Sequence, residues 1–199
     1  MTKTIAGVIL AGGRATRMGG GDKALLPVAG RPMLAHVIAR LAPQVTALAL
    51  NANGDPARFA DFGLPVLPDP LPDQPGPLAG VLAGMEWAAA QGYTHLLTVA
   101  GDTPFLPEDL VARLAKAEFT LAASPDDTGR LRQHPTVGLW PVTLRESLRA
   151  ALLRGERKVG RWAAEHGAQS VVFTAQPDPF FNVNTPDDLT LAEARFSPS

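Results

Sequence analysis

An apolar run that leads into a glycine-rich, basic stretch constrains the fold of this chain more than any other feature. Residues 5–10 form the apolar run, and residues 12–23 contain five glycines together with Arg14, Arg17 and Lys23. Glycine lets the backbone approach a ligand closely, and arginine and lysine supply the charge that phosphate oxygens need. Open α/β sheets bind nucleotides where such a turn leaves the first strand. We therefore predict a phosphate site here, with Arg17 and Lys23 as its cations.

Two better-known phosphate loops are excluded by the residues of this stretch. Ala24 follows Lys23, so the pattern G-x-x-x-x-G-K-[ST] is missing, and the stretch contains no G-x-G-x-x-G. The alternative is a basic surface loop without a ligand. The order of apolar strand, paired glycines, arginine and Gly-Asp-Lys favours a binding site over that alternative.

Apolar strand-like runs alternate with amphipathic segments along the whole chain. Strands are predicted at residues 5–10, 45–50, 64–67, 94–100, 119–123, 134–140 and 169–173. Helices are predicted at residues 33–41, 76 to about 91, from 107 onward, at 142–153 and 158–166, and after Thr185. Residues 124–133 predict a polar, turn-rich loop. The alternation predicts a three-layer, Rossmann-like α/β fold with a mostly parallel central sheet, formed by residues 1–199 as a single domain.

One acidic side chain follows the apolar run 94–100 at once, in Gly101-Asp102-Thr103-Pro104. A strand end at this position places Asp102 at the same edge of the sheet as the glycine-rich stretch. Mg²⁺ is held by one or two carboxylates together with substrate phosphates, so Asp102 is predicted to be a metal ligand and a catalytic residue. The alternative is a cap for the helix that begins near residue 107, but Asp102 lies too far upstream to cap it.

Amide and carboxylate side chains also follow two other predicted strands. Asn51 comes directly after residues 45–50, with Asn53 close behind, and Asp69 comes shortly after residues 64–67. A doubly wound sheet would place both of these strand ends beside the first strand and its glycine-rich stretch. Asn51 and Asp69 are therefore candidates for nucleotide binding. Plain turns use the same residue types, which is the alternative for both.

Two further motifs lie at predicted helix starts. Residues 76–80, Gly-Pro-Leu-Ala-Gly, offer backbone N–H groups that favour anions, although a structural helix start explains them equally well. Asn182 and Asn184 are two residues apart and share one face of an extended backbone. We expect them to hold a phosphate or to complete the surroundings of the metal. The alternative is a turn and cap before the helix that follows Thr185.

Charge and composition limit the partners of this chain. Its 18 Lys and Arg and 19 Asp and Glu leave a net charge of −1, which gives no general reason to expect nucleic acid or an anionic membrane. The absence of cysteine excludes disulfides, a thiolate nucleophile and a cysteine-ligated metal. We identify no signal peptide and no apolar run long enough to span a bilayer, so the cytoplasm is the expected location.

Four separated motifs between Leu10 and Leu189 resemble one family. The first stretch resembles the L-A-G-G-x-x-x-R-M-G signature of nucleotidyltransferases that activate small molecules with an NTP, and its ending Gly-Gly-x-Asp-Lys resembles the molybdenum cofactor guanylyltransferases. The other three are residues 76–80, residues 101–104 and Asn-x-Asn-Thr-Pro-Asp-Asp-Leu at residues 182–189. Gly101 departs from the family, which often has cysteine there, and this departure leaves the ligand Asp102 in place.

The resemblance implies an activity, a cofactor and residue roles. A nucleotidyltransferase domain of this family transfers GMP from GTP to molybdenum-molybdopterin, releases pyrophosphate and uses Mg²⁺. Asp102, Lys23 and Arg17 would act by positioning and charge neutralisation. The implied nucleotide contacts are Leu10, Ala11, Gly12, Gly13, Lys23, Asn51, Asp69 and Asp102, and the implied acceptor contacts are Asn182 and Asn184. The segments His134-Pro135 and Arg157-Lys158-Val159 also resemble the family, whose pterin acceptor needs a cationic surface.

Other functions stay open at this point. A related nucleotidyltransferase would use CTP, or a sugar or alditol phosphate as acceptor, and a non-catalytic nucleotide-binding protein would carry the cofactor. The presence of both Asp102 and Lys23 favours turnover over a carrier. The expected partners are GTP, molybdopterin or the molybdenum cofactor, and transient contacts with other cofactor-biosynthesis proteins or molybdoenzymes. The sequence does not indicate an oligomeric state.

Overall fold

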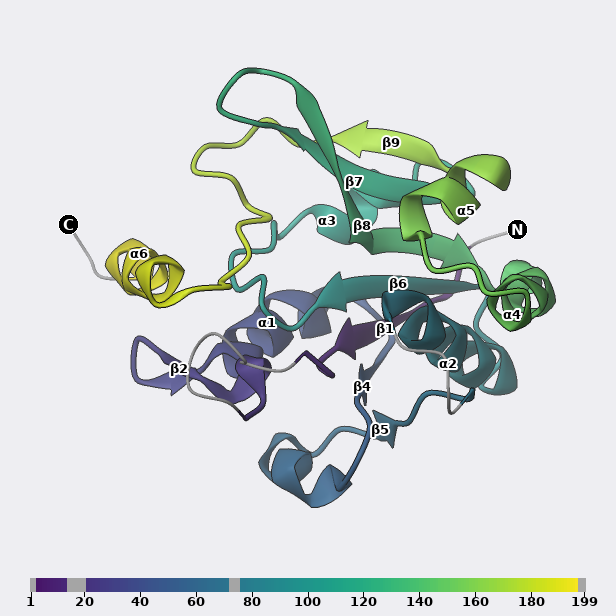
Figure 1. Ribbon diagram of the computed structural model, residues 1–199, viewed down its shortest axis with the longest axis horizontal. Coiled ribbons are helices and arrows are strands. Elements are labelled where there is room, and N and C mark those ends of the chain that lie inside the picture. The colour runs from purple at the N-terminus through teal and green to yellow at the C-terminus, as the bar shows by residue number, and fades with distance from the viewer. Residues whose placement is uncertain (1–2, 14–20, 72–75, 197–199) are drawn as a thin grey trace.

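The computed structural model describes residues 3–13, 21–71 and 76–196 (Figure 1). Its strands are β1 (Ile5–Leu10), β2 (Pro27–Val28), β3 (Arg31–Pro32), β4 (Ala47–Asn51), β5 (Val66–Leu67), β6 (His95–Ala100), β7 (Thr120–Pro125), β8 (Leu131–Pro141) and β9 (Gln169–Val172). The α-helices are α1 (Met33–Leu41), α2 (Pro77–Ala90), α3 (Leu110–Leu114), α4 (Arg145–Leu153), α5 (Val159–Glu165) and α6 (Pro186–Phe196). The 3₁₀ helices of the described residues are η1 (Lys23–Leu25), η2 (Ala42–Gln44), η3 (Pro56–Phe62) and η4 (Val142–Leu144).

A seven-stranded sheet with the order β5-β4-β1-β6-β8-β7-β9 forms the middle of the molecule. β1 pairs in parallel with β4 on one side and with β6 on the other, so its carboxyl end lies where the strand order reverses. β8 runs antiparallel to both β6 and β7, while β7 and β9 are parallel. The predicted mostly parallel sheet is confirmed, and β8 is its exception.

Helices cover both faces of this sheet and produce three layers. Side chains alternate along a strand, so Ile9 packs into the core beneath α1 and α3, whereas Val8 packs into the core beneath α2, α4 and α5. All six residues of β6 are buried, as expected for a central strand covered on both faces. The predicted α/β fold is therefore correct. Among the described residues, no helix combines the length and apolar character that crossing a bilayer requires.

A third, smaller core lies away from the sheet, between α6 and the β2–β3 hairpin. Val28, Met33, Val183 and Ala192 are its buried members. Phe196, at the end of α6, stacks on His36 with ring centroids 4.2 Å apart, and on Phe105 at 4.7 Å. This packing holds the last helix beside the first third of the chain (Figure 1).

Two local predictions are wrong. Residues 124–133 are not a loop throughout, because β7 continues to Pro125 and β8 already starts at Leu131. The carboxylate of Asp126 accepts hydrogen bonds from the backbone of Thr128 and Arg130 and so closes a five-residue turn between the strands. Hairpin pairing satisfies the backbone of this polar segment, and residues 126–133 are exposed, whereas Ser124 is buried. The helix predicted from residue 107 is short and covers only Leu110–Leu114.

Candidate functional site

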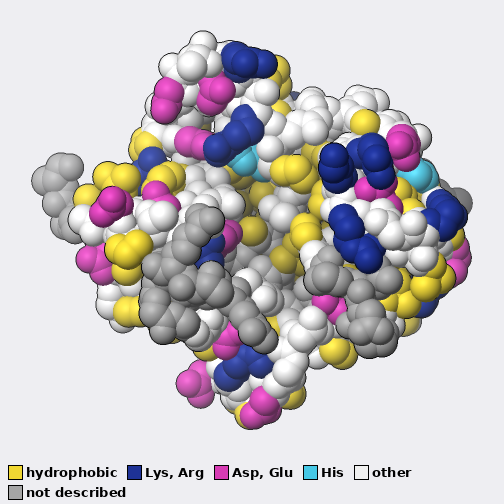
Figure 2. Space-filling view, in the orientation of Figure 1, with side chains coloured by type: hydrophobic (Ala, Val, Ile, Leu, Met, Phe, Trp, Pro, Cys, Tyr) yellow, Lys and Arg dark blue, Asp and Glu magenta, His cyan; other side chains and the backbone are white. Residues whose placement is uncertain are grey.

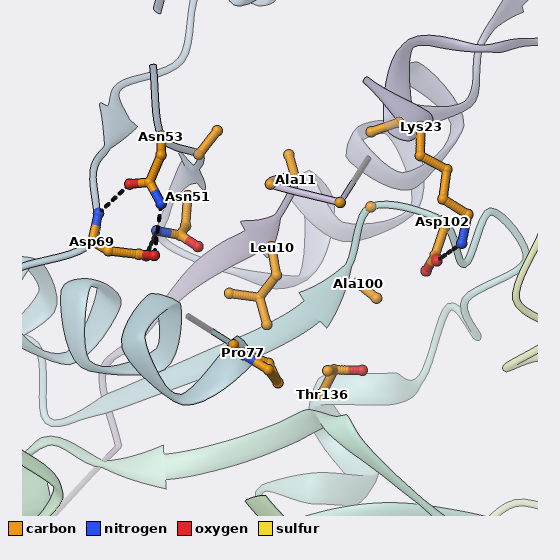
Figure 3. A pocket seen from close by; sticks show the side chains of 16 residues that line it. Leu10, Ala11, Lys23, Asn51, Asn53, Asp69, Pro77, Ala100, Asp102 and Thr136 are labelled. Atoms are coloured by element: carbon orange, nitrogen blue, oxygen red, sulfur yellow. Dashed lines mark hydrogen bonds and ion pairs between the residues drawn. The ribbon is translucent and has the colours of Figure 1, made fainter. Parts of the chain in front are cut away.

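A cavity of about 390 Å³ opens at the carboxyl ends of β1, β4 and β6 (Figure 3). This is the point at which the strand order reverses, where open α/β sheets bind their ligands. The lining residues come from all three strand ends, from η1, from the segment after β5, from the start of α2 and from β8: Leu10, Ala11, Gly12, Gly13, Lys23, Ala24, Asn51, Ala52, Asn53, Asp69, Gly76, Pro77, Ala100, Gly101, Asp102 and Thr136. Gly12, Gly13 and Lys23 of the glycine-rich stretch therefore meet Asn51, Asp69 and Asp102 in one cavity.

The first of two polar groups at this cavity is the charged end, which consists of Lys23 and Asp102 in the cavity lining and of Asn184, which contacts Lys23 from outside that lining. The ammonium of Lys23 donates to Oδ2 of Asp102 and to Oδ1 of Asn184. The backbone N–H of Lys23 also donates to the carbonyl of Gly13, with an N···O distance of 3.1 Å. These contacts hold the lysine side chain at 11% exposure, directed at the end of β6.

Only one of the two carboxylate oxygens of Asp102 is hydrogen-bonded among the described residues. Its Oδ1 atom is buried and has no hydrogen-bond partner among the described residues, whereas Oδ2 is bound by Lys23. A buried acceptor without a partner is costly, so this oxygen suits a ligand that brings positive charge. The described part of the chain contains no cluster of three or more His, Cys, Asp or Glu able to hold a metal. A metal at Asp102 would therefore take most of its other ligands from a bound molecule.

Asn184 reaches the charged end because its segment is anchored on both sides. The backbone N–H of Val183 donates to the carbonyl of Asp102 at 3.0 Å. Thr185 caps α6, since its hydroxyl accepts from the backbone of Asp188 and the Asp188 carboxylate accepts in return from the backbone of Thr185. The predicted helix cap at Thr185 is confirmed. Asn182 lies apart from Lys23 and accepts instead from the hydroxyl of Thr103 at 3.2 Å.

The second polar group is the amide end, which consists of Asn51, Asn53 and Asp69. The amide of Asn51 donates to Oδ1 of Asp69 at 2.9 Å, and the amide of Asn53 donates to Oδ2 at 2.7 Å. The Asn53 oxygen accepts from the backbone N–H of Asp69 at 2.8 Å. Each carboxylate oxygen of Asp69 is thus held by one amide, and Figure 3 shows this group on the opposite side of the cavity from Lys23 and Asp102.

The start of α2 borders the amide end closely. A Cβ atom at Gly80 would lie 2.1 Å from Oδ1 of Asn51 and 2.8 Å from Cδ2 of Leu10. Only glycine lets the helix backbone come this near to the strand ends. Within the Gly-Pro-Leu-Ala-Gly motif, Gly76 and Pro77 line the cavity, and Gly80 provides the close approach.

A second cavity, of about 400 Å³, adjoins the first. Thr136 lines both cavities, and Asn184 of the second is hydrogen-bonded to Lys23 of the first. Arg132, His134, Asn182 and Asn184 are among the residues that line the second cavity. Figure 2 shows this face of the molecule hollowed near its centre, with Lys and Arg side chains at several points of the rim.

His134 is buried beside the second cavity and stays neutral. Burial lowers the pKa of His134 to about 4, although Asp178 acts in the opposite direction. Its Nε2 atom lies 2.7 Å from the hydroxyl of Ser124, and its ring packs against Phe180 with centroids 4.7 Å apart. His134 is therefore a wall of this cavity and carries no charge near neutral pH.

The structure does not place the other basic residues named from the sequence in either cavity. Arg14 and Arg17 lie outside the described residues. Arg157 and Lys158 line neither cavity within the described part of the chain. Their backbone N–H groups instead donate to the Glu156 carboxylate. These interactions lower the pKa of Glu156 to about 2; the hydrogen bond from the Lys158 N–H has the largest effect and that from the Arg161 side chain the second largest.

Sequence reasoning gave too little weight to Asn53 and missed Thr136. An extended backbone turns residues 51 and 53 to one face, and this signal was available in the sequence. Thr136 has no comparable signal, because it reaches the cavity only through the insertion of the antiparallel strand β8 beside β6.

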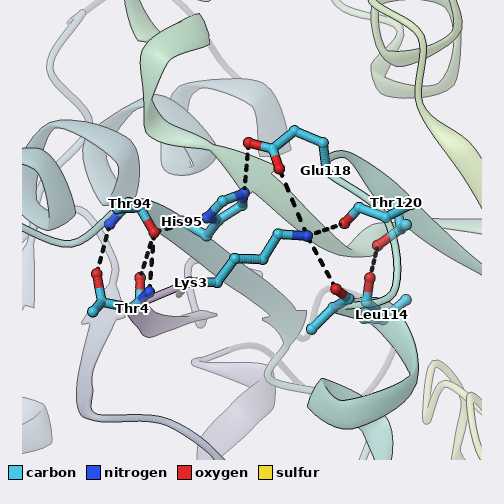
Figure 4. A network of polar contacts seen from close by, with 9 residues as sticks. Lys3, Thr4, Thr94, His95, Leu114, Glu118 and Thr120 are labelled. Atoms are coloured by element: carbon cyan, nitrogen blue, oxygen red, sulfur yellow. Dashed lines mark hydrogen bonds and ion pairs between the residues drawn. The ribbon is translucent and has the colours of Figure 1, made fainter. Parts of the chain in front are cut away.

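A different polar network lies at the opposite edge of the sheet (Figure 4). The Lys3 ammonium donates to the carbonyl of Ala115 at 3.0 Å and pairs with Glu118, whose other oxygen lies 3.1 Å from Nε2 of His95. Burial is the main cause that lowers the pKa of His95. Because these contacts tie the amino ends of β1 and β6 to the segment before β7, we assign them to stability.

Comparison with known protein families matches residues 7–171 to the family described as MobA-like NTP transferase domain. A relative from Bradyrhizobium sp. (strain ORS 278), named molybdenum cofactor guanylyltransferase, is 52% identical over 202 residues, which cover 96% of this chain and 93% of the relative. A protein of the same name from Rhodopseudomonas palustris (strain BisB5) is 54% identical, with 94% and 91% of the two chains covered.

Solved structures share the fold at low sequence identity. The crystal structure of molybdopterin-guanine dinucleotide biosynthesis protein A from Archaeoglobus fulgidus matches with a TM-score of 0.70 at 22% identity, covering 96% of this chain and 98% of that chain. A 4-diphosphocytidyl-2C-methyl-D-erythritolsynthase from Anaerococcus prevotii DSM 20548 matches with a TM-score of 0.72 at 15% identity, covering 97% and 96%. At these identities the likeness concerns the fold alone.

Proposed function

This chain belongs to the family of MobA-like NTP transferase domains, and we propose that it transfers GMP from GTP to molybdenum-molybdopterin with release of pyrophosphate. The observation that carries this proposal is that the charged end and the amide end open into one cavity. A nucleoside triphosphate has an anionic end and a hydrogen-bonding base, and this cavity offers complementary groups for both. Relatives named molybdenum cofactor guanylyltransferase, at about half identity over nearly the full chain, support the choice of substrate.

In this proposal the amide end recognises guanine. An ionised carboxylate has about four acceptor sites, so Asp69 retains lone pairs after accepting from Asn51 and Asn53. Those lone pairs suit the N1–H and exocyclic N–H donors of guanine. Asn51 and Asn53 then act by orienting Asp69, and the backbone of residues 10–13, from Leu10 to Gly13, would lie along the nucleoside.

The charged end would hold the triphosphate and the metal. The buried Oδ1 of Asp102 fits a divalent cation, and a single carboxylate completed by substrate phosphates is the usual environment of Mg²⁺. When bound, Mg²⁺ would neutralise charge on the reacting phosphates. Lys23 is a point charge beside that position and would follow the charge that grows on departing pyrophosphate. Arg17 is proposed as a second cation of the same group.

The acceptor is proposed to enter through the second cavity. Asn184 joins that cavity to Lys23, and Asn182 lines the same cavity. A terminal phosphate held by these amides would attack the α-phosphorus of GTP in line with the leaving pyrophosphate. A phosphate oxygen is already anionic near neutral pH, so the attack needs no general base. The chain then acts by positioning two anions and neutralising their charge.

The partners and the cellular location of the protein also belong to this proposal. GTP and the molybdopterin acceptor are its small-molecule partners, and we propose transient contacts with other cofactor-biosynthesis proteins or molybdoenzymes. We also propose that residues 1–199 act as one nucleotidyltransferase domain in the cytoplasm.

Calorimetric titration with GTP, CTP and ATP, each with Mg²⁺, tests the proposed nucleotide. We expect selective binding of GTP, and a loss of that binding in Asp69→Asn. Asp61→Asn is the matched control, because Asp61 is an exposed carboxylate on η3 that does not line the cavity. Preference for CTP would overturn the choice of substrate. A pyrophosphate-release assay with GTP and acceptor separates an enzyme from a cofactor carrier, since a carrier binds both and releases none.

A further inference from the structure

Arg58 lies outside every motif of this chain, yet two of its guanidinium nitrogens donate hydrogen bonds to backbone carbonyls. The third, Nε, is buried and takes part in an ion pair, with no hydrogen-bond partner among the described residues. Its Nε atom forms an ion pair with Oδ2 of Asp22 at 2.6 Å. Nη1 donates to the carbonyl of Asp55 and Nη2 donates to the carbonyl of Asn53, both at 2.6 Å. We call this group, Arg58 with Asp22, Asn53 and Asp55, the Arg58 bridge.

The Arg58 bridge connects the two ends of the nucleotide cavity. Asp22 directly precedes Lys23 of the charged end, so its ion pair with Arg58 restrains the backbone from which that lysine projects. Asn53 belongs to the amide end, where its side-chain nitrogen donates to the Asp69 carboxylate and its side-chain oxygen accepts from the Asp69 backbone N–H. One side chain therefore contacts the residue beside Lys23 and the residue that holds Asp69.

The surroundings of Arg58 keep its guanidinium in place. The side chains of Arg58 and Asp22 are 27% and 21% exposed, so the ion pair is largely removed from solvent. The guanidinium carbon lies 4.7 Å from the ring centroid of Phe59, a fully buried side chain on the same 3₁₀ turn. Gly54 has φ +84°, and a Cβ there would lie 3.2 Å from Nη1, so the glycine leaves room for the guanidinium.

We propose that Arg58 is a positioning residue that holds the charged end and the amide end at the spacing of one nucleoside triphosphate. This inference rests on the proposed function, because it assumes that one ligand uses both ends. When one end of such a ligand is bound, the other end binds at an effective concentration that depends on the spacing of the two sites. A fixed spacing also lowers the ordering cost of binding.

Two substitutions break the bridge from opposite sides. Arg58→Lys keeps the positive charge but loses the planar fork that contacts three partners at once. Asp22→Asn removes the ion pair and leaves both hydrogen bonds from Arg58 to backbone carbonyls in place. For each variant we expect the Kd and the KM for GTP to rise about tenfold, while kcat at saturating GTP stays within about twofold of the wild type.

Half-ligands separate positioning from a general structural role. Guanosine reaches only the amide end and inorganic pyrophosphate only the charged end, so neither depends on the spacing. Both should bind Arg58→Lys and Asp22→Asn within about twofold of the wild type in calorimetric competition with GTP. The double variant should lose little more GTP affinity than Arg58→Lys alone, since both substitutions break the same contact.

Arg40→Lys is the matched control. Arg40 forms an ion pair of the same length, 2.6 Å, with Glu108, and neither residue lines the nucleotide cavity within the described chain. Arg40→Lys should leave every affinity unchanged, and thermal unfolding of all variants checks that they fold.

Three results would overturn the inference, and only one of them also overturns the proposed function. Unchanged GTP affinity in both bridge variants refutes the spacing role and leaves guanylyl transfer intact. A loss of guanosine affinity equal to that of GTP means that Arg58 only shapes the amide end. Failure of the wild type to bind GTP refutes the proposed function, and the inference with it.

Discussion

The two ends of the proposed nucleotide cavity, the amide end and the charged end, are built in different ways. At the amide end, Asp69 is bound by Asn51 and Asn53, which lie 18 and 16 residues away in the sequence. At the charged end, Lys23 binds Asp102 and Asn184, which lie 79 and 161 residues away. The first group is made by neighbouring strand ends, and the second requires the chain to return from its carboxyl-terminal part.

The two ends also differ in what they leave unsatisfied. The amide end pairs its donors and acceptors with one another, so it is organised before a ligand arrives. The charged end leaves Oδ1 of Asp102 buried without a partner among the described residues. We infer that the amide end serves selection of the base, whereas the charged end reserves its interactions for a metal and for the charge of the reaction.

The largest effect is expected from Asp102→Asn, which removes the negative charge of the proposed metal ligand while keeping the shape of the side chain. We expect transfer to fall about a thousandfold or more, because charge neutralisation at the phosphates is worth several kcal/mol. Guanosine binding should be unchanged, because it uses only the amide end. Pyrophosphate release and guanosine calorimetry measure the two effects, with the exposed Asp109→Asn as control. A variant with full transfer activity would refute the metal assignment.

The next largest effect is expected from Phe196→Ala, which weakens the packing of α6 against the rest of the chain. Asn184, just before α6, should then be held less firmly beside Lys23. The substitution removes two aromatic stacking contacts, each worth roughly 0.5–1.5 kcal/mol, so the free energy of unfolding should fall by about 2 kcal/mol. The KM for the acceptor should rise while guanosine affinity stays constant. Chemical denaturation and steady-state kinetics test this, and Leu191→Ala, at an exposed position of the same helix, is the control. Equal effects of the two substitutions would contradict the proposal that Phe196 holds α6 in place.

A smaller effect is expected from Asn53→Ala, which disturbs only the amide end. Asp69 loses one donor to its carboxylate and one acceptor for its backbone N–H. A hydrogen bond to a charged group contributes about 1.5–3 kcal/mol, and water replaces part of it, so guanosine affinity should fall about tenfold. Pyrophosphate affinity should not change. If pyrophosphate binding fell equally, the two ends would not be separable in the way that their contacts indicate.

The smallest effect is expected from pH, through His134 beside the second cavity. Because its pKa is about 4 in the folded chain and near 6.5 when unfolded, the unfolded chain binds more protons between these values. The contribution of His134 to the free energy of unfolding is therefore present above pH 6.5 and is lost as the pH falls toward 4. The free energy of unfolding should fall by about 1 kcal/mol between pH 7 and 5.5. Denaturation of His134→Gln across this range should show a shallower slope, to which His95 still contributes. An unchanged slope would show that His134 is not the titrating group.

Much of the amide end was predictable because it depends on local rules. Alternating apolar segments indicate parallel strands, and parallel strands bring Leu10, Asn51 and Ala100 to one edge. Polar residues just beyond those strand ends must then line the same cavity. The hairpin at residues 124–133 was not predictable in this way, because its polar residues fit a loop and a solvent-facing strand edge equally well.

The sequence by itself determined the fold class, the edge of the sheet that carries the site, and the residue types available there. These follow from side-chain periodicity and from turn chemistry, which act over a few residues. Only the tertiary structure decided that Asn184 rather than Asn182 reaches Lys23, that Thr136 joins two cavities, and that Arg58 contacts Asp22. Such contacts depend on how α6, β8 and η3 pack against distant parts of the chain, and no local pattern specifies that packing.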